Sequence, residues 1–209
     1  MPNFNFNKII KTLIITDFLV YSGWGLVMPV FAVFILGSIK GGDAQVAGTA
    51  AGIYWVVKSL IQIPIGKFLD RNHGEKDDYW FMVSGTFFAS LTPLVLVFAS
   101  EAWHIYGVQV FYAICMAMVI PSWGGIFTRN ADKGREAETW GFESSLLGIG
   151  MGVAGILGGF MVKALGFTPL FIAVSVFGIL GSLLLLIIRK DISPKGGEVL
   201  PIKKIDHVM

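Results

Sequence analysis

The sequence predicts an all-α membrane protein with six transmembrane helices, and two observations lead to this prediction. First, 55% of the 209 residues are hydrophobic and 14% are charged, which is too little charge to cover a water-soluble domain of this size. Second, the apolar residues form six long, continuous runs. Only helices and closed barrels satisfy their backbone in lipid, and continuous runs favour helices over the alternating pattern of barrel strands.

Each apolar run is long enough for a helix to cross a bilayer, which needs roughly 20 residues. The predicted spans cover residues 12–37, 45–69, 79–99, 104–128, 138–162 and 167–188. We therefore predict one transmembrane domain over residues 1–190. Residues 191–209 are predicted to form a polar cytoplasmic tail, because Pro, Gly and charged residues replace the apolar pattern there.

The distribution of Lys and Arg predicts how the chain lies in the membrane. Of the 16 Lys and Arg residues, all but Lys40, Lys58 and Lys163 fall on the side of the N-terminus. Positive charge accumulates on cytoplasmic loops, so both termini are predicted to be cytoplasmic, with the cell membrane as the location. The net charge of +2 reflects these loops and gives no reason to expect a nucleic-acid partner.

The two halves of the predicted domain share an internal pattern. Three glycines of the first three spans align at one constant offset with glycines of the last three: Gly48 with Gly141, Gly66 with Gly159 and Gly85 with Gly178. Because each half holds an odd number of spans, the two copies would lie upside down relative to each other. Such a 3+3 inverted repeat is a recurring design of secondary transporters.

A charged loop between the second and third spans carries the most specific motif. It holds a glycine, an Asp-Arg pair, a turn glycine and a lysine: Gly66, Asp70, Arg71, Gly74 and Lys76. This pattern resembles the signature loop of the major facilitator superfamily, although one extra residue precedes the turn glycine. The resemblance implies a conformational latch, in which the loop engages another part of the transporter. The alternative is that a cytoplasmic loop simply needs charges and a turn glycine.

The fifth span also resembles the superfamily, in part. Four glycines at helical spacing would lie on one face and permit close helix packing: Gly148, Gly152, Gly155 and Gly159. The family's hinge proline is replaced by the Ala154-Gly155 step, and the arginine that the family often carries in span four would fall near Val110. The face packs either within these six spans or against another half of the transporter.

Ionisable residues inside the predicted spans are candidates for a functional site, because each costs roughly 2.5–3.5 kcal/mol to insert near a helix centre. Asp17 and Glu143 are candidate protonation sites, and Lys58 is a candidate contact for an anionic substrate group. Other polar or aromatic residues share their faces or fall in the spans that the resemblance places around a central cavity: Tyr21, Trp24, Gln62 and Gln109. The alternative is that the acids reach water at the interface and Lys58 extends toward it. An Asp17–Lys58 ion pair would be marginal, since about 10 Å of axial offset separates them.

The family resemblance covers six spans, so it implies the N-terminal half of the usual twelve-span fold. We expect a transporter half that moves a small solute by alternating access, as a homodimer or with a second half-sized chain. The open alternatives are a non-transporting regulatory subunit and a fragment of a split or truncated transporter. No catalytic motif, metal cluster or cofactor motif is recognisable in the sequence, which disfavours an enzyme. The substrate is not encoded in any motif.

Overall fold

The computed structural model describes residues 6–71 and 75–192. Over these residues the chain is helical, with short connections and no β-strand. The elements are α1 (Lys8–Val27), α2 (Phe31–Ser38), α3 (Ala44–Arg71), α4 (Glu75–Leu96), α5 (Ala102–Asn130), α6 (Glu136–Leu165), α7 (Phe167–Leu184) and the 3₁₀ helix η1 (Leu185–Ile188). Six helical segments are long and apolar enough to cross a membrane, which confirms the predicted fold class. The 3+3 repeat stays a prediction.

The first predicted span, 12–37, consists of two helices. α1 ends at Val27 and α2 begins at Phe31, with Pro29 in the turn between them. Proline has no N–H to continue a helical ladder, so the break falls where the sequence offers the weakest backbone. By contrast, α5 runs through Pro121 as one helix. The predicted tail lies almost wholly outside the described residues.

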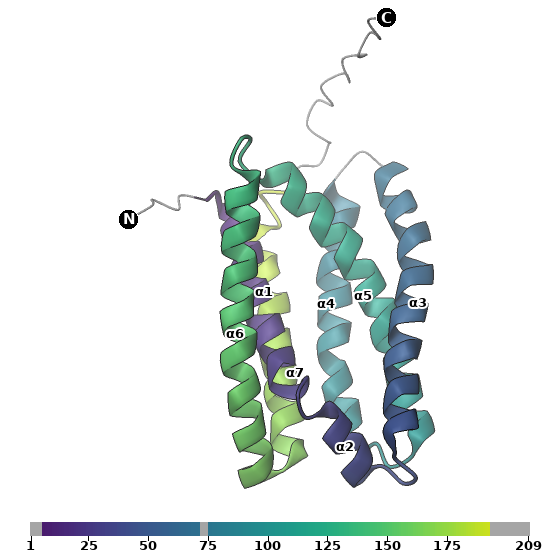
Figure 1. Ribbon diagram of the computed structural model, residues 1–209. Coiled ribbons are helices and arrows are strands. Elements are labelled where there is room, and N and C mark those ends of the chain that lie inside the picture. The colour runs from purple at the N-terminus through teal and green to yellow at the C-terminus, as the bar shows by residue number, and fades with distance from the viewer. Residues whose placement is uncertain (1–5, 72–74, 193–209) are drawn as a thin grey trace, which may run out of the picture.

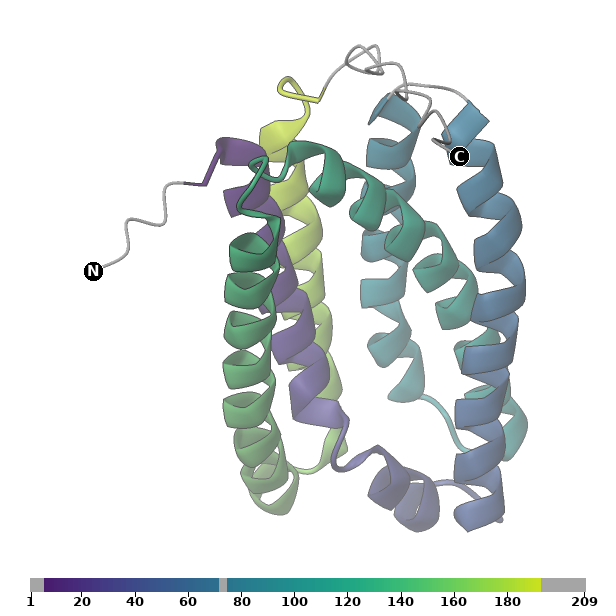
Figure 2. The same ribbon diagram turned by 45° about the horizontal axis from the view of Figure 1, so that its top comes forward.

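The six long helices form two groups of three (Figures 1 and 2). α1, α6 and α7 lie side by side in one group, and α3, α4 and α5 form the other. The two groups meet chiefly where α4 packs along α7. α2 lies across one end of the bundle, far from the end at which α1 begins. Long-range packing therefore brings residues of α1 and α6 together, although the whole α3–α5 group separates them in sequence.

Glycines allow α1 and α6 to approach closely. A Cβ on Gly158 would overlap the backbone carbonyl of Leu26 on α1. A Cβ on Gly25 would come within 2.9 Å of the backbone of Met151 on α6. Small residues at such crossings let helix backbones make van der Waals contact, which is the main source of helix association in lipid. These glycines therefore set how closely α1 and α6 pack.

Apolar side chains fill both ends of the bundle and also cover its outside. One buried cluster, with Ile10, Tyr79, Phe127 and Leu185 among its members, lies at the end where α1 begins. A smaller buried cluster contains Ala89, Tyr112, Cys115 and Met116. α3 and α6 are the least buried of the six spans, and their outward side chains are large and apolar, as lipid contact requires.

Candidate functional site

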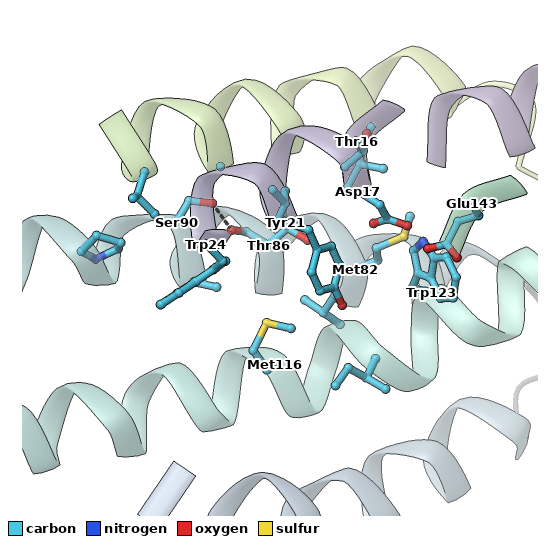
Figure 3. A pocket seen from close by; sticks show the side chains of 18 of the residues that line it. Thr16, Asp17, Tyr21, Trp24, Met82, Thr86, Ser90, Met116, Trp123 and Glu143 are labelled. Carbon is cyan, nitrogen blue, oxygen red and sulfur yellow. Dashed lines mark hydrogen bonds between the residues drawn. The ribbon is translucent and has the colours of Figure 1, made fainter. Parts of the chain in front are cut away.

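A cavity of about 260 Å³ lies inside the bundle between the two helix groups. Five helices and η1 contribute to its wall, and no Lys, Arg or His of the described chain is among its lining residues. Figure 3 shows the side chains that surround it. The lining residues that carry polar or aromatic groups are Thr16, Asp17, Tyr21, Trp24, Thr86, Ser90, Trp123, Trp140 and Glu143.

Two carboxyl groups share one end of this cavity. Asp17 projects from α1 and Glu143 from α6, and Figure 3 shows both turned toward the indole of Trp123 on α5. Both acids are buried, yet no ion pair to either is found in the described part of the chain. The Asp17 Oδ2 and Trp123 Nε1 atoms are buried without a hydrogen-bond partner among the described residues. Burying such groups unsatisfied is costly, which makes this end of the cavity the candidate site for a proton or a ligand.

The rest of the cavity wall is aromatic, sulfur-containing or internally satisfied. The hydroxyl of Ser90 donates to the carbonyl oxygen of Thr86 at 2.6 Å, a bond within α4 that Figure 3 shows dashed. Met82 on α4 and Met116 on α5 both line the cavity. The ring of Trp24 lies 4.5 Å from that of Tyr112, centroid to centroid. This wall suits an apolar body.

Three of the predicted site residues do not line the cavity: Lys58, Gln62 and Gln109. The Lys58 side chain is buried against its own helix, with its Nζ atom 3.9 Å from the Trp55 ring centroid and 5.4 Å from that of Tyr54. No ion pair between Asp17 and Lys58 is present in the described structure. The cation is stabilised instead by two aromatic faces one turn away. Asp17, Tyr21, Trp24 and Glu143 do lie together around the cavity.

The predicted latch lies at the end of α3 and the start of α4. Asp70, Arg71 and Lys76 are exposed there, whereas Gly74 lies outside the described residues. A Cβ on Gly66 would meet Pro121 of α5 at 3.8 Å, an ordinary contact. The role of these residues as a latch stays a prediction.

Next to the latch, the start of α4 carries a second pair of buried acids. Glu75 accepts a hydrogen bond from Arg129 Nε at 3.0 Å, and Arg129 also donates to Asp78. Asn130 Nδ2 donates to the same Glu75 carboxylate at 3.1 Å. These contacts tie the first turn of α4 to the last turn of α5.

The glycines of α6 divide between two faces. Gly150, Ala154 and Gly158 face α1. A Cβ added at Gly148, Gly152 or Gly159 meets no atom within 4 Å, whereas one at Gly155 would lie 3.3 Å from Pro29 Cγ. The predicted stripe is therefore largely an open face of this chain.

Sequence reasoning missed Trp123, Thr86 and Ser90, and it missed the Arg129 cluster. Thr86 and Ser90 are one turn apart in an apolar span, a spacing that marks a polar helix face. Glu75, Asp78 and Arg129 sit at helix ends, where charges are expected and draw no notice.

Comparison with known proteins fits this architecture. The sequence model of the Major Facilitator Superfamily matches residues 13–207. The chain belongs to this superfamily. It is also 29% identical over 192 residues to an uncharacterised MFS-type transporter of Methanocaldococcus jannaschii. That alignment covers 91% of this chain and 48% of the relative, so the chain spans about half the length of the curated relative it matches. It is an integral, multi-pass membrane protein with membrane-spanning helices of the superfamily type.

Proposed function

We propose that this chain is a six-helix half of a secondary transporter that moves a small solute across the membrane by alternating access. The observation that carries the proposal is the buried carboxylate of Asp17, which faces an internal cavity without a partner among the described residues. Membership of the superfamily and the transporter name of the relative support the same class of function. An enzymatic role has no comparable support.

Within this function, Asp17 and Glu143 are the proposed coupling site. Both carboxyls line the same end of the cavity, and the proposal is that they bind and release a proton as a pair. Water reaching the cavity from one side at a time would let the pair take up a proton on one side and release it on the other. Tyr21 and Trp24, next to Asp17 on α1, are proposed to contact the solute.

Alternating access needs a second wall for the cavity to close against. We propose that another copy of this chain or a second half-sized chain supplies it. The open glycine face of α6, with Gly148, Gly152 and Gly159, and the exposed charges at Asp70 and Arg71 are the proposed contact regions. The chain matches about half the length of its relative, so a separate chain that resembles the relative's other half is the second candidate for this wall. In either case both termini are proposed to be cytoplasmic, in the cell membrane.

The test uses the full chain in lipid vesicles that contain a pH-sensitive dye. A panel of small solutes is added on one side, with and without an imposed pH gradient. We expect at least one solute to move protons in the wild-type vesicles, and the Asp17→Asn protein to lose this response. A proton response that is unchanged in Asp17→Asn would contradict the coupling role.

Assembly is tested separately by chemical cross-linking and native mass spectrometry in mild detergent. The proposal expects a dimer or a complex with a second chain. A strictly monomeric protein that still transports would contradict the need for a second wall.

A further inference from the structure

We propose that the cavity binds a small, lipophilic organic cation, held between its two carboxyls and its aromatic wall. This inference rests on the proposed transport function, for which it names the substrate class. It follows from the charge, the unpaired groups, the wall and the size of the cavity.

The charge of the cavity has one sign. Asp17 and Glu143 are its only ionisable groups besides the phenol of Tyr21, and no basic side chain of the described chain lines it. The nearest aromatic row, Trp24, Tyr112 and Tyr54, leads away to Lys58, whose ammonium group is covered by Trp55 and Tyr54. A buried carboxylate needs a counter-charge or a proton. A cationic ligand would supply this counter-charge, since no basic side chain of the described residues lines the cavity.

One oxygen of the Asp17 carboxylate also lacks a hydrogen bond that would stabilise its negative charge. Its Oδ2 atom is buried and accepts no hydrogen bond from the described residues. Trp123 Nε1, toward which the Asp17 carboxyl is turned, is likewise unpartnered. The opposite end of the cavity differs, because the Ser90 hydroxyl is already satisfied by Thr86. The unsatisfied polar groups named here, Asp17 Oδ2 and Trp123 Nε1, therefore lie at the acidic end of the cavity.

The wall selects an organic ion over a metal ion. No group of three or more His, Cys, Asp or Glu residues that could hold a metal exists within the described residues. Ca²⁺ and similar hard cations need six or more oxygen ligands. The aromatic rings of Tyr21, Trp24 and Trp123 instead offer faces that attract a diffuse positive charge. Met82 and Met116 add polarisable, adaptable contacts to an apolar body.

The size of the cavity limits the ligand. Its volume of about 260 Å³ is just below the range of roughly 300–1,000 Å³ typical of sites for drug-sized ligands. A cation with two aromatic rings, such as 1-methyl-4-phenylpyridinium, is therefore a suitable probe. Its charge is permanent, so its binding does not depend on its own protonation.

The experiment compares three probes of nearly the same shape and different charge, binding to the full chain in detergent at pH 8. They are 1-methyl-4-phenylpyridinium, neutral 4-phenylpyridine and anionic biphenyl-4-carboxylate. Titration calorimetry gives each Kd, and tryptophan fluorescence checks that the probe reaches the cavity. We expect the cation to bind at least about tenfold more tightly than the neutral probe, because the carboxylates and aromatic rings attract its charge, and the anion to bind more weakly than either. A neutral or anionic probe that binds as tightly as the cation would overturn the inference.

Asp17→Asn and Glu143→Gln identify the groups responsible. Each variant keeps the side-chain shape and removes one charge. We expect the cation preference to fall by about tenfold in each, because one charge–charge attraction is lost, while affinity for the neutral probe stays unchanged and shows that the cavity is intact. The matched controls are Asp43→Asn and Glu136→Gln, which lie at the starts of α3 and α6 away from the cavity. Cavity variants that retain the full preference would also overturn the inference.

The two proposals fail in distinguishable ways. Vesicles that show proton-coupled movement of other solutes, with no cation preference in binding, would overturn the substrate class and retain the transport function. Cation binding that depends on Asp17 and Glu143, in vesicles that transport no solute of the panel, would support the binding site and overturn transport by copies of this chain alone.

Discussion

Two pairs of buried acids lie in the same helical bundle, and their surroundings differ. Glu75 and Asp78 are 6% and 3% exposed, and Asp17 and Glu143 are 8% and 5% exposed. The first pair contacts Arg129, whereas no ion pair to the second exists among the described residues. Burial alone therefore does not distinguish a structural carboxylate from a functional one, whereas the presence or absence of a cationic partner does separate these two pairs.

The position of each pair along its helix strengthens the contrast. Glu75 and Asp78 occupy the first turn of α4, where the unpaired N–H groups of a helix start stabilise negative charge. Asp17 lies more than two turns into α1 and Glu143 about two turns into α6, beyond the first turn to which that effect is confined. The first pair is stabilised twice and serves the fold. The second has neither form of stabilisation, which is why we propose that a proton or a ligand neutralises it.

The largest expected effect is on coupling. Replacing Asp17 by Asn removes the ionisable group and keeps its shape, so proton movement driven by solute is expected to fall by about 100-fold, as for an essential proton carrier. Thermal stability in detergent should change little, because no ion pair is broken. Dye-loaded vesicles measure the first quantity and a thermal melt the second. A large loss of stability with normal coupling would reverse the assignment of this pair.

A smaller effect is expected where α1 and α6 touch, because this contact brings Asp17 and Glu143 together. Gly158→Ala forces a methyl group against the backbone of Leu26, and overpacking typically costs 1–3 kcal/mol. For a chain of this size, 3 kcal/mol would lower Tm by roughly 6–12 °C. Gly141→Ala, on the same helix, is the matched control, since a Cβ there meets nothing within 4 Å. Equal melting temperatures for the two variants would show that α1 and α6 are not locked at this point.

Breaking the paired acids should cost somewhat less. Arg129→Gln leaves Glu75 and Asp78 without their cation, and breaking a fully buried pair costs roughly 3–5 kcal/mol. Because 43% of the Arg129 side chain is exposed, we expect about 2 kcal/mol, a Tm lower by roughly 4–8 °C. Binding of 1-methyl-4-phenylpyridinium should be unchanged. Loss of that binding with full stability would place Arg129 in the functional site.

The smallest effect is expected at the surface. Lys8 and Asp191 form an ion pair at 2.7 Å between the start of α1 and the end of the described chain, and both side chains are exposed. Exposed pairs contribute 0–1 kcal/mol, so Lys8→Gln should shift Tm by no more than about 3 °C. A thermal melt at low and high salt measures it. A larger shift would mean that this pair holds α1 in place.

The sequence was most informative where a residue was expensive in lipid. Asp17 and Glu143 were found as lone acids in apolar runs, and the helices themselves followed from run length. Lys58 was predicted for the same reason, but no residue of α3 lines the cavity. Tyr54 and Trp55, one turn before Lys58 on that helix, cover its charge instead. That spacing was already visible in the sequence.

What the sequence could not supply was the rotation of each helix about its axis. Thr86 and Ser90 cost little in a membrane, since a hydroxyl can bond to its own helix, so nothing marked them as cavity residues. The sequence did not mark Trp123 as a cavity residue either, because tryptophan is found in lipid-facing, interfacial and core positions alike. The latch residues and the inverted repeat stay predictions that these helices alone do not test.

The sole cysteine of the chain, Cys115, lies buried on α5 in the small cluster with Tyr112 and Met116. Met116, the next residue on α5, lines the cavity, so we expect a motion that opens the cavity toward water to change the exposure of this sulfur as well. Cys115 can therefore serve as a native thiol probe of this motion. The rate at which a maleimide reagent attaches to Cys115, measured with and without the organic cation, reports how often the bundle opens and whether the ligand holds it shut.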